Sequence, residues 1–174
     1  MRIFLVFIFS FFFFSSNAQN TDIDWLQAIN VHRNQSLDPS FKLITNSASA
    51  VSVLCPISVY GVGFIAKDST LMRKGIYVAG TMAISATLTY ALKYSINRKR
   101  PFETYEFIDK QSKGGGPSFP SGHTSHAFAT ATAMTFAFPK WYVAVPAFSW
   151  AGAVGYSRMH LGVHYPSDVL VGAL

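Results

Sequence analysis

Apolar residues dominate four long runs of this sequence, at about residues 47–66, 75–94, 122–138 and 141–156, and a fifth run extends from about 167 to the last residue. Runs of roughly 17 to 20 residues suit either membrane spans or the buried helices of an all-α domain. Serine, threonine, glycine and alanine are frequent in them, which permits close contacts between helices. The pattern therefore predicts an all-α helical bundle.

The first 18 residues follow a different pattern, that of a leader. A short charged region at residues 1–2 precedes an apolar run at 3–14, and the small residues Ser16 and Ala18 follow it. This order is typical of a secretory signal peptide. An apolar run of about a dozen residues is short for an uncleaved span of about 20. We expect residues 1–18 to be a signal peptide.

Residues 19–46 mix polar and apolar side chains before the first long run begins. Trp25, Ile29 and His32 follow a helical spacing, which predicts an amphipathic helix that is either packed or interfacial. We expect residues 19–46 to form an N-terminal periplasmic or interfacial segment. The remaining residues, 47–174, are expected to form one helical domain.

The end of the chain falls within an apolar run. About 156 residues remain after the leader, which is enough for one domain. The chain stops six residues beyond Asp168, within what the apolar pattern indicates is an unfinished helix. Helical membrane segments need more length than this, so we expect the C-terminal helix to be incomplete and the chain to be a fragment.

The first of three chemistry-bearing stretches is the basic segment that follows the second apolar run. Lys93 and Arg100 lie seven residues apart, which is two helical turns. Both cations can therefore project from one face of a helix that Pro101 then ends. Taken alone, the segment is also typical of a solvated basic helix end, where cations favour the helix dipole.

The second stretch, Pro120-Ser121-Gly122-His123, directly precedes an apolar run. That position predicts a helix N-terminus, where unpaired backbone N–H groups and the dipole attract an anion. Ser121 or Thr124 could instead simply cap the helix.

The third stretch contains Ser157 and Arg158, then His164, then Asp168. A histidine and an aspartate at i and i+4 can pair, and the carboxylate then holds the imidazole in one tautomer. A purely structural His–Asp pair is the alternative for this stretch taken alone.

Together, and in this order, the three stretches resemble the signature of the type 2 phosphatidic acid phosphatase superfamily, which includes lipid phosphatases, bacterial acid phosphatases and vanadium haloperoxidases. The resemblance spans residues 93–168. Every position that the signature specifies is matched, by Lys93, Arg100, Pro101, Pro120, Ser121, Gly122, His123, Ser157, Arg158, His164 and Asp168.

The resemblance implies a role for each polar residue of the signature. His164 would be the nucleophile that forms a phosphohistidine, Asp168 would orient it, and His123 would be the general acid. The phosphoryl oxygens would be held by an anion cradle that consists of Lys93, Arg100, Arg158, the Ser121 hydroxyl and the Gly122 N–H. This scheme needs no metal and no cofactor.

The other histidines and the glycine run have simpler interpretations. His32, His126 and His160 lack paired carboxylates at ligand spacing, so we interpret them as packing or surface residues. The polar loop at residues 102–118 contains the run 114–116, and no Lys-Ser/Thr follows it. A loop hinge is favoured over a phosphate-binding role for that run.

Charge placement favours membrane spans over a soluble core. If the N-terminus is exported, the loops after the first and third runs face the cytoplasm, and they carry Lys67, Arg73, Lys74 and Lys140. This agrees with the positive-inside rule. The three signature stretches then meet at the outer face. A soluble helical domain would also bring them together, so that alternative stays open.

Composition removes two other interpretations. The formal net charge is +6, but no basic face with interleaved aromatic residues stands out, so nucleic acid is not an expected partner. The single cysteine, Cys55, cannot form an intrachain disulfide, so an exported domain must rely on packing.

These observations and the resemblance lead to one expected function with two alternatives. We expect a metal-independent phosphatase in a bacterial-type cytoplasmic membrane that hydrolyses a lipid-linked phosphate or pyrophosphate at the periplasmic face. Phosphatidic acid, phosphatidylglycerol phosphate and undecaprenyl pyrophosphate are candidate substrates. The alternatives are a soluble periplasmic acid phosphatase of broad specificity and a vanadium haloperoxidase, which would bind vanadate at His164.

Overall fold

The computed structural model describes residues 21–174, and the predicted signal peptide lies outside this part of the chain. The described residues are mostly helical and include no strand, which confirms the all-α prediction. The elements are an N-terminal helical segment (residues 21–30), η1 (Gln35–Leu37), α2 (Asp38–Ile65), α3 (Ser69–Ile96), α4 (Pro101–Thr104), α5 (Gly122–Ala137), α6 (Trp141–His160) and α7 (Pro166–Ala173).

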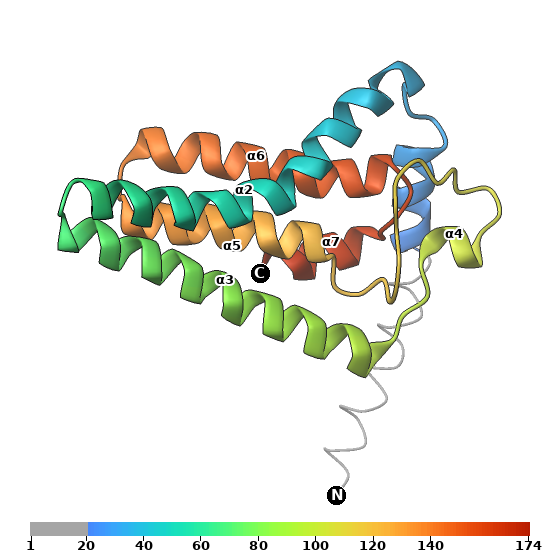
Figure 1. Cartoon of the computed structure of the whole chain (residues 1–174). Coiled ribbons are helices and arrows are strands. Elements are labelled where there is room, and N and C mark those ends of the chain that lie inside the picture. The colour runs from blue at the N-terminus through green and yellow to red at the C-terminus, as the bar shows by residue number, and fades with distance from the viewer. Residues whose placement is uncertain (1–20) are drawn as a thin grey trace, which may run out of the picture.

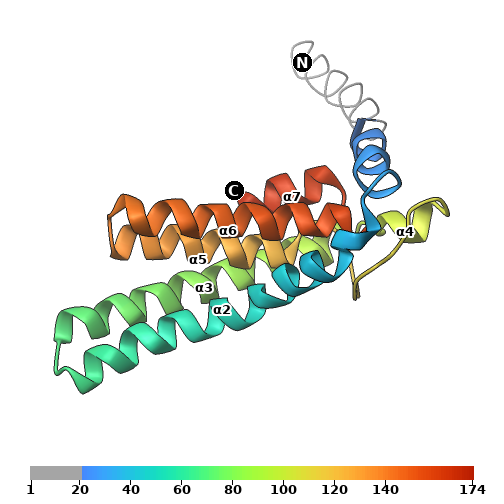
Figure 2. The same ribbon diagram turned by 90° about the horizontal axis from the view of Figure 1, so that it is seen from above.

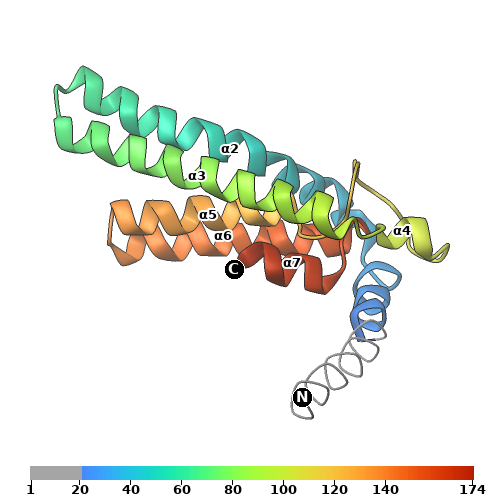
Figure 3. The same ribbon diagram turned by 90° about the horizontal axis from the view of Figure 1, so that it is seen from below.

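Two antiparallel helix pairs form the bundle. Helices α2 and α3 make one hairpin, α5 and α6 make the other, and the two hairpins pack along their length (Figures 1 and 2). Both hairpin turns lie at the same end of the bundle, whereas α4 and its loop lie at the opposite end. The short helix α7 packs on α5 and α6 near the loop end (Figure 3).

The α2–α3 hairpin depends on a capped turn and on close helix approach. The Asp68 carboxylate accepts hydrogen bonds from the backbone N–H groups of Thr70 and Leu71, which satisfies two donors at the start of α3. A Cβ atom at Gly75 would lie 2.7 Å from the backbone nitrogen of Tyr60. The two helices therefore touch at a point that only a glycine fits, as small residues allow in membrane bundles.

The core of the bundle is narrow and the outside is apolar. Small side chains fill the centre, namely Ala48, Ala127, Ala131, Ala151 and Val154. Large apolar side chains instead point outward, including Leu43, Leu54, Ile57, Phe64, Ile65, Ile76, Ile84 and Leu88, each at least 59% exposed. Helices α2 and α3 are both long and apolar enough to cross a membrane. This inverted distribution is that of a bundle surrounded by lipid.

Two details at the N-terminal side differ from the sequence pattern. Helix α2 begins at Asp38, earlier than the predicted run at residue 47, because its first turns mix polar residues with Phe41, Leu43 and Ile44 and so form no continuous apolar run. The predicted segment boundary after residue 46 thus falls inside a helix, and the division itself stays a prediction. The packed alternative is wrong for Trp25, which is 63% exposed, because Ile23 and Leu26 form the buried face.

Candidate active site

The three signature stretches meet at the end of the bundle that carries α4 (Figure 1). They come from the C-terminal ends of α3 and α6, the N-terminal ends of α5 and α7, and the segment that leads into α4. The structure therefore brings all of the predicted site residues to one region, although it places some of them on different elements than the sequence predicts.

The prediction that Lys93 and Arg100 share one helix face is wrong. Helix α3 ends at Ile96, because Asn97 adopts the left-handed conformation (φ 49°, ψ 42°) and donates its N–H to the carbonyl of Lys93. Asparagine tolerates this conformation and commonly ends helices in this way. Arg100 is extended, and Pro101 begins α4 rather than ending α3, in the first position that proline favours.

Arg100 is buried and held mainly by backbone carbonyls. Its guanidinium donates to the carbonyls of Gly115 and Gly116 at 3.0 Å each and to that of Val163 at 2.8 Å. Its Nη1 also lies 3.2 Å from Nε2 of His164. The glycine run, which the sequence predicts as a hinge, thus provides the acceptors that orient this arginine.

Lys93 reaches the same loop from the end of α3. Its ammonium group donates to the carbonyl of Pro117 at 2.8 Å and contacts that of Ser118 at 3.4 Å. Gly122 lies beside the lysine stem, since a Cβ atom there would be 3.7 Å from Cε of Lys93. The lysine and the start of α5 are therefore neighbours, as a shared anion site requires.

His164 is buried between a carboxylate and a guanidinium. Its Nδ1 lies 3.3 Å from Oδ2 of Asp168, and its Nε2 faces Arg100. Because an arginine can only donate, Nε2 must accept, which places the imidazole proton on Nδ1 toward Asp168. Burial lowers the pKa of His164 to about 3, and the nearby Arg100 charge acts in the same direction. The imidazole is therefore neutral near pH 7, with a lone pair on Nε2.

Asp168 has more partners than the sequence predicts. Oδ2 accepts hydrogen bonds from the Ser118 hydroxyl and from the backbone N–H of Tyr165, and Oδ1 accepts one from Arg98 at 2.8 Å. Neither Ser118 nor Arg98 belongs to the signature. The only feature of the sequence that could indicate these partners is a second arginine two residues before Arg100. Nothing in the sequence indicates a role for Ser118.

The start of α5 has no side-chain cap. Ser121 occupies the N-cap position, but its side chain makes no capping hydrogen bond. Instead its hydroxyl accepts a hydrogen bond from Thr124 at 2.8 Å, so the simple capping alternative is wrong for both residues. His123 is half-buried on the first turn of α5, within electrostatic range of Arg158, Arg100 and Lys93.

Arg158 enters the site from α6 and is 1% exposed. Its Nη1 donates to the hydroxyl of Thr45 at 2.6 Å, and Nη2 donates to the carbonyl of Lys113 at 3.3 Å. Its Nε is buried and has no hydrogen-bond partner within residues 21–174. An unpaired buried donor of this kind is costly, and an anion would satisfy it.

Two of the other histidines, His160 and His32, lie outside the anion cradle. His160 is buried and pairs with Asp38 at 2.9 Å, and its ring packs 4.3 Å from that of Phe41, centroid to centroid. His32 is exposed at the N-terminal side. Among the described residues, no group of three or more His, Cys, Asp or Glu side chains could hold a metal ion.

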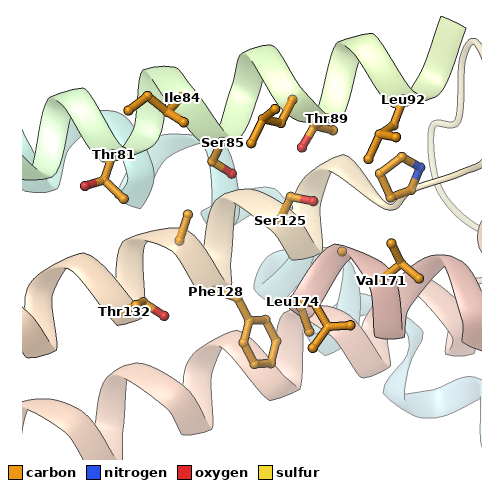
Figure 4. A pocket seen from close by; sticks show the side chains of 15 residues that line it. Thr81, Ile84, Ser85, Thr89, Leu92, Ser125, Phe128, Thr132, Val171 and Leu174 are labelled. Carbon is orange, nitrogen blue, oxygen red and sulfur yellow. The ribbon is translucent and has the colours of Figure 1, made fainter. Parts of the chain in front are cut away.

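An apolar groove adjoins the cradle. It has a volume of about 390 Å³ and lies between α3, α5 and α7, with Thr81, Ile84, Ser85, Thr89, Leu92, Ser125, Phe128, Thr132, Val171 and Leu174 among the residues that line it (Figure 4). Thr89 and Leu92 lie within one turn of Lys93, and Pro120, which also lines the groove, directly precedes Ser121. The groove and the anion cradle are therefore adjacent.

The apolar outer surface, the buried His–Asp pair and the cations clustered at one end define a class, that of helical membrane proteins with a polar, cation-rich site at the end of the bundle. Within this class, residues 74–174 match the model of the PAP2 superfamily. The chain belongs to that superfamily, as the three signature stretches predict.

Individual relatives agree with this assignment. The chain is 31% identical over 53% of its length to a lipid A 4'-phosphatase of Bacteroides thetaiotaomicron. It is 30% identical over 80% of its length to the undecaprenyl-diphosphatase BcrC of Bacillus subtilis. A crystal structure of a transmembrane PAP2 type phosphatidylglycerolphosphate phosphatase from Bacillus subtilis superposes with a TM-score of 0.74 at 27% identity, covering 97% of this chain and 88% of that one.

The relatives are longer than this chain. It spans about half of the lipid A 4'-phosphatase, 47%, and 69% of BcrC. The fold class is confirmed by these comparisons, whereas the activity of the whole protein is a matter for proposal.

Proposed function

We propose that this chain forms the catalytic part of a metal-independent phosphatase that hydrolyses a lipid-linked phosphomonoester or pyrophosphate through a phosphohistidine on His164. The observation that carries the proposal is the arrangement of His164, whose proton lies toward Asp168 and whose lone pair lies toward Arg100. A neutral imidazole held in this tautomer is a competent nucleophile at neutral pH.

The reaction has two steps. The lone pair on Nε2 of His164 attacks phosphorus, a P–N bond forms, and the P–O bond to the leaving group breaks. His123 gives its proton to the departing oxygen, because a bound phosphate dianion favours the protonated form of a nearby imidazole. A water molecule then attacks the phosphohistidine, His123 takes a proton from it, and the P–N bond breaks.

The anion cradle supplies the charge stabilisation. Lys93, Arg100 and Arg158 converge on the site, and the unpaired Nε of Arg158 is a donor that a phosphoryl oxygen would satisfy. The open N-terminus of α5 adds backbone N–H groups at Gly122 and beyond. These groups provide the positive field that a metal ion provides in other phosphatases.

The apolar groove supports a lipid as the carrier of the phosphate. It begins beside Leu92 and Pro120, the neighbours in sequence of Lys93 and Ser121. It continues between α3, α5 and α7 (Figure 4). A substrate with its phosphate in the cradle could therefore place an acyl or prenyl chain along α3 without leaving the bilayer. The named relatives act on lipid A and on undecaprenyl diphosphate, both lipid-linked.

The periplasmic face is supported by the distribution of charge. Lys67 lies in the α2–α3 turn, Arg73 and Lys74 lie in the first turns of α3, and Lys140 lies in the α5–α6 turn. This is the end of the bundle opposite to the cradle (Figure 1). The proposed orientation takes these turns as cytoplasmic under the positive-inside rule, and it assigns the more numerous cations at the cradle end, including Lys93, Arg100 and Arg158, to the substrate phosphate.

A panel of lipid phosphates tests the proposal. We expect the detergent-purified protein to release phosphate from at least one of phosphatidic acid, phosphatidylglycerol phosphate and undecaprenyl pyrophosphate, with activity that survives EDTA. His164→Ala should reduce the rate by at least about 1,000-fold and abolish acid-labile labelling by radioactive phosphate. Full loss of activity in EDTA, restored by one divalent metal, would overturn the metal-free mechanism, and labelling of the His164→Ala protein would overturn the nucleophile.

A further inference from the structure

We propose that Arg98 is a positioning residue of this site, which fixes the Asp168 carboxylate against His164, and that Asp22 of the N-terminal helical segment holds Arg98 in place. The effect on catalysis rests on the proposed function, in which His164 is the nucleophile. The contacts themselves do not depend on it.

Arg98 makes hydrogen bonds along the edge of its guanidinium group and an aromatic contact over its face. Nη1 donates to Oδ1 of Asp168 at 2.8 Å and to the hydroxyl of Ser167 at 2.7 Å, and Nη2 donates to Oδ2 of Asp22 at 2.8 Å. The group also stacks on the ring of Tyr165, 3.8 Å from its centroid. The planar guanidinium of an arginine can bind two carboxylates and stack on an aromatic ring at the same time, which a lysine ammonium group cannot do.

The contact with Arg98 completes the set of partners around Asp168. Oδ2 is occupied by Ser118, by the N–H of Tyr165 and by His164, which leaves Oδ1 to Arg98. The carboxylate is 0% exposed, so no solvent can replace a lost partner. With both oxygens engaged, the carboxylate cannot rotate, and Oδ2 stays directed at Nδ1 of His164. Arg98 therefore acts on the nucleophile through Asp168.

Asp22 links this arrangement to the N-terminal segment. It is buried, its Oδ1 accepts the backbone N–H of Ser167 at 2.8 Å, and its Oδ2 accepts from Arg98 and from the Ser167 hydroxyl. Asp22 thus anchors both the arginine and the first turn of α7, which carries Asp168. It also lies well before residue 74, where the superfamily match begins. The site therefore extends into a part of the chain that the signature does not cover.

The charge of Arg98 gives a way to distinguish a positioning role from a purely structural one. The charged groups that face His164 are Asp168 on α7, Arg100 at the start of α4 and Arg158 on α6. Arg98 offsets the negative charge of Asp168. Without it, an uncompensated carboxylate would face the imidazole and favour its protonated form. Loss of Arg98 should therefore change the protonation of His164, which loss of a merely structural contact would not do.

The test compares Arg98→Met with Lys99→Met in the full chain, purified in detergent. Lys99 is the neighbouring cation and is exposed, so its variant removes the same charge without touching Asp168. Two further variants are more conservative: Arg98→Lys keeps the positive charge, and Asp22→Asn keeps the shape of the side chain. The first readout is the ¹⁵N NMR signal of His164 between about pH 5 and about pH 8, where an ordinary histidine titrates. The second is kcat and KM with whichever lipid phosphate of the panel the wild type hydrolyses.

We expect the His164 signal to be flat over this range in the wild type and in Lys99→Met, and to titrate in Arg98→Met. The kcat of Arg98→Met should fall about 10- to 100-fold with little change in KM, because the nucleophile is misplaced while the cradle is intact. Arg98→Lys should restore the flat signal but not the full kcat, and Asp22→Asn should show a smaller change of the same sign.

The outcomes are separable. A His164 signal in Arg98→Met that superimposes on that of Lys99→Met would overturn the role of Arg98, whether or not the protein is active. A wild-type protein that releases no phosphate from any lipid would overturn the proposed function, and the NMR comparison would still decide whether Arg98 controls His164. If Arg98→Met does not fold, Asp22→Asn takes its place in the NMR comparison with Lys99→Met, and Arg98→Lys tests the fall in kcat alone.

Discussion

At the scale of single residues, burial of His164 keeps the imidazole neutral, which the proposed mechanism needs, but it also lowers the stability of the folded protein in acid. The folded protein keeps His164 neutral, since burial lowers its pKa from 6.5 to about 3. An unfolded imidazole binds a proton near its ordinary pKa. Between these two values the unfolded state binds more protons than the folded state, so the free energy of unfolding decreases as the pH falls.

This difference gives a pH prediction. We expect the thermal unfolding temperature of the wild type to fall as the pH is lowered from about 6.5 toward about 4, and to fall less steeply in His164→Ala, which lacks the group. Calorimetry of both proteins in the same detergent measures the two slopes. Parallel curves would show that His164 does not titrate with a lowered pKa in the folded protein.

The general-acid role proposed for His123 can be tested with leaving groups of different basicity. His123→Ala should slow the hydrolysis of a lipid phosphate about 100- to 10,000-fold, because an alkoxide needs a proton as it leaves. The loss should be much smaller for nitrophenyl phosphate, since a phenolate is a weak base. Rates for both substrates, in the wild type and in the variant, provide the measurement. Equal losses would argue that His123 only binds the phosphate.

The sequence predicts the signature residues well but not the residues that hold them. His164 and Asp168 could be paired from their spacing, because both lie within one short segment. Arg98 and Ser118 could not, since their contacts with Asp168 cross 70 and 50 residues of chain. No local periodicity encodes a hydrogen bond over such a separation.

At the scale of elements, apolar periodicity finds the helices but not their ends. The pattern predicts the four long helices and the start of α7, whereas the break between Lys93 and Arg100 depends on one left-handed residue, Asn97. The seven-residue spacing between Lys93 and Arg100 therefore spans the end of α3 and does not describe one helix face. The two cations still meet, because the turn brings Arg100 back over the same end of the bundle.

The contact between α2 and α3 yields a prediction with an internal control. Gly75→Ala should destabilise the protein by about 1 to 3 kcal/mol, because the new methyl group would meet the backbone of Tyr60 at under 3 Å. Gly80→Ala lies on the same helix with nothing within 4 Å of its Cβ position, so it should be neutral or slightly stabilising. Thermal unfolding in detergent compares the two. Equal effects would mean that the hairpin is not closely packed at Gly75.

At the scale of the whole molecule, the proposed orientation in the membrane can be tested at the basic turns. A reporter inserted after residue 110, in the loop beside the cradle, should be periplasmic, and one fused after Lys140, at the α5–α6 turn, should be cytoplasmic. Alkaline phosphatase and fluorescent protein fusions at both points measure this. Two external reporters would indicate a soluble exported domain, and exchanged locations would reverse the orientation.

The loop that joins the two hairpins has a further consequence for how the sequence can vary. It holds the cradle cations mainly through main-chain oxygens, those of Lys113, Gly115, Gly116 and Pro117. A main-chain oxygen is present whatever the side chain, so many substitutions in this loop should leave the cations in place. Deleting one residue would instead shift every later oxygen away from its cation. The length of this loop should therefore be more constrained than the identity of its residues. A comparison of homologues by residue identity alone would then understate the importance of the loop.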